Sequence, residues 1–317
     1  MVRSLLQMVV AAQQELGLPQ SATVIGNADV STNQLLGYAQ YETELQLQLV
    51  AWTDMQLEFN ITVNPPTILT GTVTNNSAII TGLSSTAVLE AYYWQVSGNG
   101  IPTAARIKSV DSATQITMTM QATATSSTSV TFGKDTYAEP SDFGWFLADT
   151  WYDRTNRWKL LGPDSPQQDQ LNRSGVVSFG PRRHFRQIGP LANSYRIWPA
   201  PTDVTVPLQL VFEYVSKNAV ATAGNRANRS QFYTLDTDIP LLDDRAIIMG
   251  MKWRFWAQKG FDAARLEREY DIYVERLIAR DGGNKTLSLI QVEDSFLLDF
   301  ENVQDGSFPG FIGTNSS

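Results

Sequence analysis

The first sixty residues carry two amphipathic helical patterns followed by a strand pattern. Apolar residues recur every three or four positions over residues 4–16, and Gly17 provides the cap that ends this helix. The same spacing returns over residues 29–52 and predicts a second, longer helix. Residues 55–61 then alternate between apolar and polar, which predicts a strand that runs into the next segment.

Residues 64–134 differ from the rest of the chain. They are rich in Thr, Ser, Ala, Gly and Val, and they begin with the stiff sequence Asn64-Pro65-Pro66. Short β-prone runs alternate here with turn-rich stretches and cover residues 73–81, 106–110, 115–120 and 129–132. This spacing predicts a small β-sandwich or barrel, inserted into a host domain formed by the sequence on both sides.

The host pattern resumes at residue 135 with strands and then helices. We expect strands at 185–188, 195–198 and 208–216, a helix that begins at Asp243 or Asp244, and a helix over 262–280. The predicted fold class is therefore α+β: a helical bundle of about four helices with a β-rich subdomain and the inserted β domain. The host comprises residues 1–63 and 135–285, and residues 286–317 form a C-terminal arm.

The arm, Thr286 to Ser317, has no sustained period but is rich in large apolar side chains. Two interpretations are open: the arm packs on the body of its own chain, or it docks on another subunit. On the second interpretation the portal or subunit interface residues are Leu287, Leu289, Ile290, Phe296, Leu297, Phe300, Phe308 and Phe311.

Charge is unevenly distributed along the chain. The net charge is −8, yet 20 of the 24 Lys and Arg residues lie between Arg154 and Lys285. Residues 1–60 hold one base against six acids, and no base follows Lys285. This asymmetry fits complementary interfaces between copies or partners, and it also fits an ordinary uneven surface.

The residue types expected of an enzyme are scarce. The chain has no Cys and only His184, which excludes disulfides and thiolate zinc sites. The acid pairs Asp236/Asp238 and Asp243/Asp244 precede a helix, where carboxylates cap backbone amides. We therefore expect no catalytic, cofactor-binding or metal-binding residues and no cofactor, and neither a signal peptide nor a membrane span.

Two groups of basic residues are the candidates for contact with nucleic acid. Arg182, Arg183 and Arg186 form one group, and Arg226 and Arg229 form the other. Because the chain is acidic overall and no reading module is visible, we do not expect sequence-specific binding.

The most specific string runs from Asp149 to Pro163. It sets Asp, Arg, Thr and Asn between tryptophans, which suits an interface or a rigid structural corner because Arg binds carboxylates and Asn forms turns. The residues that carry this structural motif are Trp151, Asp153, Arg154, Asn156, Arg157 and Trp158.

About three quarters of the chain resembles the head-to-tail adaptor, or connector, proteins of tailed bacteriophages. The resemblance rests on the order of several short motifs rather than on any one of them. These are Glu15-Leu16-Gly17-Leu18-Pro19, Asn33-Gln34-Leu35-Leu36, the Asp149–Arg157 string, Pro199-Ala200-Pro201, Phe212-Glu213-Tyr214-Val215-Ser216, Asp236-Thr237-Asp238, Trp253-Arg254, Lys259-Gly260-Phe261-Asp262 and Ala279-Arg280-Asp281-Gly282-Gly283.

The resemblance implies a structural virion protein at the neck, assembled in the cytoplasm of the bacterial host. It implies a homo-oligomeric ring, typically a dodecamer, that binds the portal protein and docks tail proteins of nozzle, tubular or fibre type. Genomic DNA would pass through the ring without sequence-specific binding. Residues 64–134 resemble a small β module of phage tail proteins and are expected to project from the ring, where they either contact tail or fibre subunits or only decorate it. Two alternatives remain open: a cell-wall hydrolase that uses Asp236 and Asp238, and a glycan-binding module centred on residues 64–134.

Overall fold

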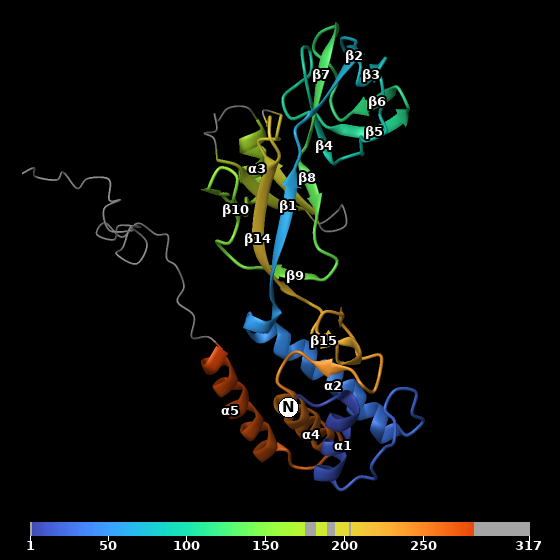
Figure 1. Ribbon diagram of the computed structural model, residues 1–317, viewed down its shortest axis with the longest axis vertical. Helices are drawn as coiled ribbons and strands as arrows, with labels where there is room; N and C mark the ends of the chain where they lie inside the picture. Colours follow the sequence, from blue (N-terminus) through green and yellow to red (C-terminus); the bar gives the residue numbers. More distant parts are fainter. Residues whose placement is uncertain (1, 175–181, 189–193, 203, 282–317) are drawn as a thin grey trace, which may run out of the picture.

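The computed structural model describes residues 2–174, 182–188, 194–202 and 204–281. Over these residues the protein is an α+β structure with five α-helices and several antiparallel sheets. Figure 1 shows the parts arranged along one axis, with most helices at one end, sheets in the middle and residues 67–134 at the other end. The helices are α1 (Leu5–Leu16), α2 (Val30–Leu49), α3 (Pro166–Arg173), α4 (Asp244–Gln258) and α5 (Ala264–Asp281), with 3-10 turns η1 (Thr53–Met55) and η2 (Thr222–Gly224).

Local capping explains where the first helix begins and ends. Ser4 and Gln7 form a reciprocal capping box at the start of α1, and Gly17 ends it with a left-handed φ of 70°. α1, α2 and α4 then share one apolar core, which includes Leu5, Leu35 and Ile247.

α5 packs against this helical end through a narrow stripe. Tyr270, Val274 and Leu277 are its buried residues, spaced three or four apart as one helix face requires. The Tyr270 hydroxyl donates a 2.7 Å hydrogen bond to Glu42, a fully buried carboxylate of α2 that also pairs with Arg254 of α4. One buried acid therefore links α2, α4 and α5.

Two sheets share an apolar core in the middle of the molecule. Alternation in β1 and β14 points Ile61, Val63, Leu210 and Phe212 into it, where they meet Tyr195 of the facing sheet. The first sheet has β1 (Gln56–Val63), β14 (Leu208–Ser216), β10 (Tyr152–Asp153) and β11 (Trp158–Lys159) in that order, with β9 (Phe143–Phe146) also paired to β14. The second has β12 (His184–Ile188), β13 (Ser194–Trp198) and β8 (Thr136–Ala138), and a third joins β16 (Arg229–Ser230), β15 (Val220–Ala221) and β17 (Ile239–Pro240).

Residues 67–134 form one six-stranded antiparallel sheet with its own apolar core around Phe132, Ile107 and Ile116. The strand order is β4-β7-β2-β3-β6-β5, and among the described strands it forms neither two stacked sheets nor a barrel. One isolated β-bridge, between Gln95 of β4 and Arg106 just before β5, connects the two edges of this sheet. The strands are β2 (Thr67–Val73), β3 (Ile79–Thr81), β4 (Trp94–Ser97), β5 (Ile107–Ser112), β6 (Gln115–Met118) and β7 (Ser126–Lys134).

The structure corrects several sequence-based boundaries. The second helix ends at Leu49 rather than Trp52, because Val50 is already extended. Residues 73–81 are not one strand: a turn at residues 74–78 separates the end of β2 from β3. The sandwich or barrel expected for the insert is one sheet, and α3 and β4 were not predicted. The predicted arm, 286–317, lies outside the described residues.

Candidate functional site

The Asp149–Lys159 segment forms a rigid corner whose anchor is Trp151. This side chain is 1% exposed and lies between two rings, stacked on Phe185 at 4.2 Å and on Phe212 at 4.1 Å between ring centroids. Tyr195 meets its edge at 4.9 Å. Trp151 therefore belongs to the core between the two sheets, and the polar residues that follow it are fixed by this anchor.

Asp153 closes the turn after β10. Its Oδ1 accepts hydrogen bonds from the backbone N–H groups of Thr155 at 2.9 Å and Asn156 at 3.0 Å, and its Oδ2 accepts from the Asn156 side chain at 2.8 Å. Arg157 then adopts a left-handed φ of 60°, which is uncommon for a residue with a long side chain. The turn therefore displays Arg157 and Trp158 to solvent on a defined backbone.

Arg154 reaches from this turn across β14 to Glu58 of β1. Its two terminal nitrogens donate to the two carboxylate oxygens of Glu58 at 3.2 and 2.6 Å, which is the bidentate geometry that Arg favours. Glu58 lies directly opposite Glu213 in the β1–β14 ladder. Two like charges in this position repel each other, so Arg154 neutralises one member of an unfavourable pair.

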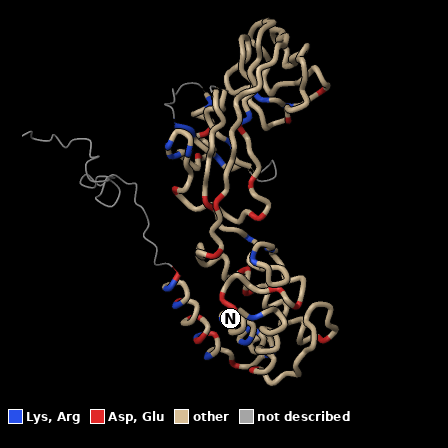
Figure 2. Tube along the Cα trace, viewed as in Figure 1, with Lys and Arg blue, Asp and Glu red and all other residues tan. Residues whose placement is uncertain are grey.

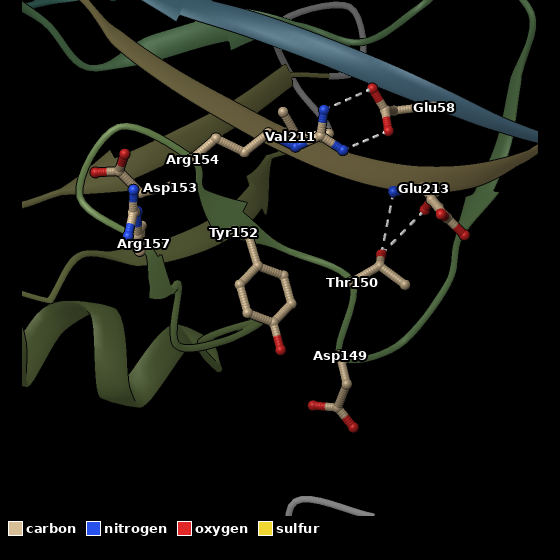
Figure 3. A pocket seen from close by; sticks show the side chains of 9 residues that line it. All are labelled: Glu58, Asp149, Thr150, Tyr152, Asp153, Arg154, Arg157, Val211 and Glu213. Carbon is tan, nitrogen blue, oxygen red and sulfur yellow. Dashed lines mark hydrogen bonds and ion pairs between the residues drawn. The ribbon is translucent and has the colours of Figure 1, made fainter. Parts of the chain in front are cut away.

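A hollow of about 520 Å³ lies in front of this corner (Figure 3). At its edge the backbone N–H of Glu213 donates a 3.1 Å hydrogen bond to the Thr150 hydroxyl. The side chains of Tyr152 and Asp149 project beside the hollow. Its lining residues are Glu58, Asp149, Thr150, Tyr152, Asp153, Arg154, Arg157, Val211 and Glu213.

The side chains that line the hollow are suited to recognise a charged partner surface. Apart from the buried Asp153, the charged groups of the hollow are the Glu58–Arg154 and Asp149–Lys159 ion pairs and the exposed side chains of Arg157 and Glu213. Such groups contribute little to stability at a solvated surface, but they confer charge specificity when a partner covers them. We therefore interpret the corner and its hollow as a polar interaction site.

The sequence motif is distributed between core and surface. Trp151 and Asp153 are buried, whereas Arg154, Asn156, Arg157 and Trp158 are exposed. The predicted interface residues of the arm, from Leu287 to Phe311, lie outside the described residues.

A second charged cluster, which our sequence analysis did not identify, lies where residues 67–134 meet the host. Arg106 donates to Asp135 at 2.7 Å and to Thr136 at 2.8 Å, and both members of this ion pair are nearly fully buried. Burial raises the pKa of Asp135, and the neighbouring Arg106 and Arg196 oppose that rise. This pair fixes the root of the insert by charge-assisted hydrogen bonds.

The same cluster extends to α3. Asp169 pairs with Arg186 at 2.7 Å, with Arg196 at 3.6 Å and with Arg173 at 3.9 Å. Burial, together with the neighbouring Arg106, lowers the pKa of Arg196 to about 10. Figure 2 shows the blue of Lys and Arg gathered over this part of the sheet region. The sequence shows a run of Arg residues between positions 154 and 196. It does not show which acids pair with them, because acids such as Asp135 and Asp169 are separated along the chain from the Arg residues that they face.

The acid pairs considered for catalysis serve as loop clamps. Asp236 accepts hydrogen bonds from the N–H groups of Val24 and Ile25 at 3.1 and 2.8 Å. Asp238, which is fully buried, accepts from three backbone N–H groups at 2.7 to 2.8 Å. Burial alone would raise the pKa of Asp238, but these amides outweigh it and hold the pKa below its usual value.

The second pair and the single histidine also have structural partners. Asp243 accepts from the Ala246 N–H at 3.0 Å and caps α4, as expected from the sequence. Asp244 accepts from the Arg3 N–H at 3.2 Å. His184 lies in β12 with its Nδ1 3.1 Å from Asp164.

Within the part of the chain that the structure describes, no group of three or more His, Cys, Asp or Glu residues is arranged to hold a metal ion. In the same residues no helix combines the length and apolar character needed to cross a membrane. No protein-family model matches the chain, and no curated protein sequence matches it either.

Proposed function

We propose that this chain is a structural adaptor of the head-to-tail junction of a tailed bacteriophage, which assembles as a ring beneath the portal. The observation that carries the proposal is the arrangement along one axis of a helical end, a two-sheet middle and the insert (Figure 1). Each part has its own apolar core, so each end presents a stable surface of distinct chemistry. A protein that joins two different assemblies needs two such ends.

In this proposal four helices, α1, α2, α4 and α5, act together as a bundle that faces the portal. The insert at the opposite end contacts tail or fibre subunits. Large apolar side chains are exposed at both ends, as expected where partners bind. They include Tyr41, Trp256 and Phe261 at the helical end and Ile68, Val88 and Met120 on the insert.

The polar corner is assigned to contacts between neighbouring copies in the ring. Its exposed Arg154–Glu58 pair and the exposed Glu213 offer alternating charges, which can set the register of identical subunits. The acidic net charge suits a channel through which DNA passes, because like charges reduce adhesion.

Electron microscopy of the full chain, alone and mixed with the portal protein of the same phage, tests the proposal. We expect rings seated on the portal, with native mass spectrometry giving the number of copies. Arg154→Glu is expected to weaken ring formation, because it places a third carboxylate beside Glu58 and Glu213. Arg265→Glu is the matched control, since Arg265 also forms an exposed ion pair, with Glu269 on α5. A chain that stays monomeric at all concentrations and ignores the portal would refute the adaptor role.

The hydrolase alternative places its catalytic acids at Asp236 and Asp238. Oδ1 of Asp236 and both carboxylate oxygens of Asp238 accept backbone N–H groups, so a catalytic role through these oxygens would require the loops at residues 24, 223 and 235 to release them. Hydrolysis of peptidoglycan by the purified chain, lost in Asp236→Asn, would nevertheless favour the enzyme over the adaptor.

A further inference from the structure

A groove between α2 and α4 lies open at the helical end. It has a volume of about 440 Å³, which is within the range of small-ligand pockets, and its lining is mainly apolar. Four α2 residues at positions i, i+3, i+4 and i+7 form one wall, and one α4 residue forms the other. The lining residues are Gln34, Gly37, Tyr38, Tyr41 and Arg254.

Gly37 is an exposed residue in the α2 wall of this groove and has no packing function within the described residues. Nothing lies within 4 Å of the position that a Cβ would occupy, and the backbone there is helical. A glycine inside a helix costs about 1 kcal/mol relative to alanine. The missing side chain leaves a notch that an incoming apolar side chain can fill.

Arg254 is preorganised at the rim of the notch. Its Nε donates to the buried Glu42, and its guanidinium lies 4.6 Å from the centroid of the Tyr41 ring and 4.2 Å from that of Trp253. The Arg254 side chain is 19% exposed, so part of it reaches the surface. A fixed guanidinium beside an apolar notch is suited to bind a carboxylate next to an aromatic ring.

The C-terminal segment of the sequence places a carboxylate near a Phe ring three times. Residues 286–317 contain five acids and no base. Within them an acid lies within three positions of a Phe at Asp294/Phe296, Asp299/Phe300 and Asp305/Phe308. Asp281 accepts the Thr53 N–H just after α2, and Gly37 lies about 20 Å back along that helix, whereas the 13 residues from Gly282 to Asp294 can span about 45 Å when extended.

We propose that the α2–α4 groove binds the segment 294–308 of this chain, with a Phe ring in the Gly37 notch and a neighbouring carboxylate on Arg254. The inference does not depend on the adaptor role. It concerns what the C-terminal segment binds, either in its own copy or in an adjacent one.

Site-specific cross-linking in the full chain tests this docking. Because the sequence has no Cys, Gln34→Cys provides a unique thiol for a benzophenone label beside the notch. Irradiation should join the label to residues 294–308, identified by mass spectrometry. A mixture of heavy and light isotope chains shows whether the cross-link lies within a copy or between copies, and either result supports the proposal. Ser127→Cys on the exposed face of β7 should give no such product.

Two substitutions at the notch separate docking from folding. Gly37→Leu fills the notch and should reduce the cross-linking yield about tenfold, the effect of losing one buried apolar side chain. Gly37→Ala also replaces the helical glycine but leaves most of the notch open, so it should retain the yield. Circular dichroism of both variants confirms that the helices form. Equal yields in the two variants, or cross-links only outside 294–308, would overturn the proposal.

Discussion

Two glycines in neighbouring helices should respond in opposite directions to the same substitution. Gly250 lies in α4 where a Cβ would come within 2.3 Å of Cδ and 2.5 Å of Cγ of Glu42. Gly37 lies in α2 with open space around it. Alanine improves helix propensity equally at both positions, by about 1 kcal/mol, so any difference between the variants reports the contact with Glu42.

The expected loss of stability in Gly250→Ala follows from the contacts that Glu42 makes. This buried carboxylate pairs with Arg254 and accepts the Tyr270 hydroxyl, so displacing it breaks a buried ion pair, which costs about 3–5 kcal/mol. After the gain in helix propensity, Gly250→Ala should lower the free energy of unfolding by about 2–4 kcal/mol. Gly37→Ala should raise it by about 0.5–1 kcal/mol.

Urea unfolding followed by far-ultraviolet circular dichroism measures both changes. The double variant Gly250→Ala/Glu42→Ala should lose less than the sum of the two single changes, because the added methyl group then enters the space that Glu42 leaves. If Gly250→Ala stabilises the protein as Gly37→Ala does, the tight contact with Glu42 is refuted.

Three further predictions follow from the site residues. Trp151→Ala removes the ring stacked between two aromatic partners and should destabilise the protein by about 3–5 kcal/mol in urea unfolding, whereas Trp151→Phe should cost clearly less. The lowered pKa of Asp238 contributes stability at all pH values above about 4, which is lost as pH falls through the folded pKa. Acid titration of the unfolding free energy should therefore show a smaller drop below pH 4 in Asp238→Asn; an unchanged profile contradicts this. Arg154→Ala removes an exposed pair and should change stability by less than about 1 kcal/mol even at low salt; a larger loss would mean the pair is structural.

The sequence revealed those elements whose burial is periodic. α1 and β14 have clear boundaries because their apolar spacing, caps and flanking turns agree. α3 was missed because it is short and polar: among its eight residues only Asp169 and Asn172 are buried, and both are polar. A helix that is held by ion pairs and a capping box has no apolar period to detect.

The motif residues could be found from the sequence, but their roles could not be distinguished. Trp151 and Trp158 look alike in the string, yet one is 1% and the other 37% exposed. The difference depends on Phe185 and Phe212, which come from strands far along the chain. Likewise, the pairing of Arg106 with Asp135 required the return of β7 to the start of the insert.

The register of β2 and β7 makes the insert removable in principle. Thr67, near its first residue, pairs directly with Phe132, near its last, so entry and exit are separated only by the spacing of adjacent strands, about 5 Å. A turn of two or three residues could close that gap without moving β1 or β8. The same geometry would allow a foreign domain with adjacent termini to be grafted at this position, and it provides a simple route by which related chains could gain or lose such a domain.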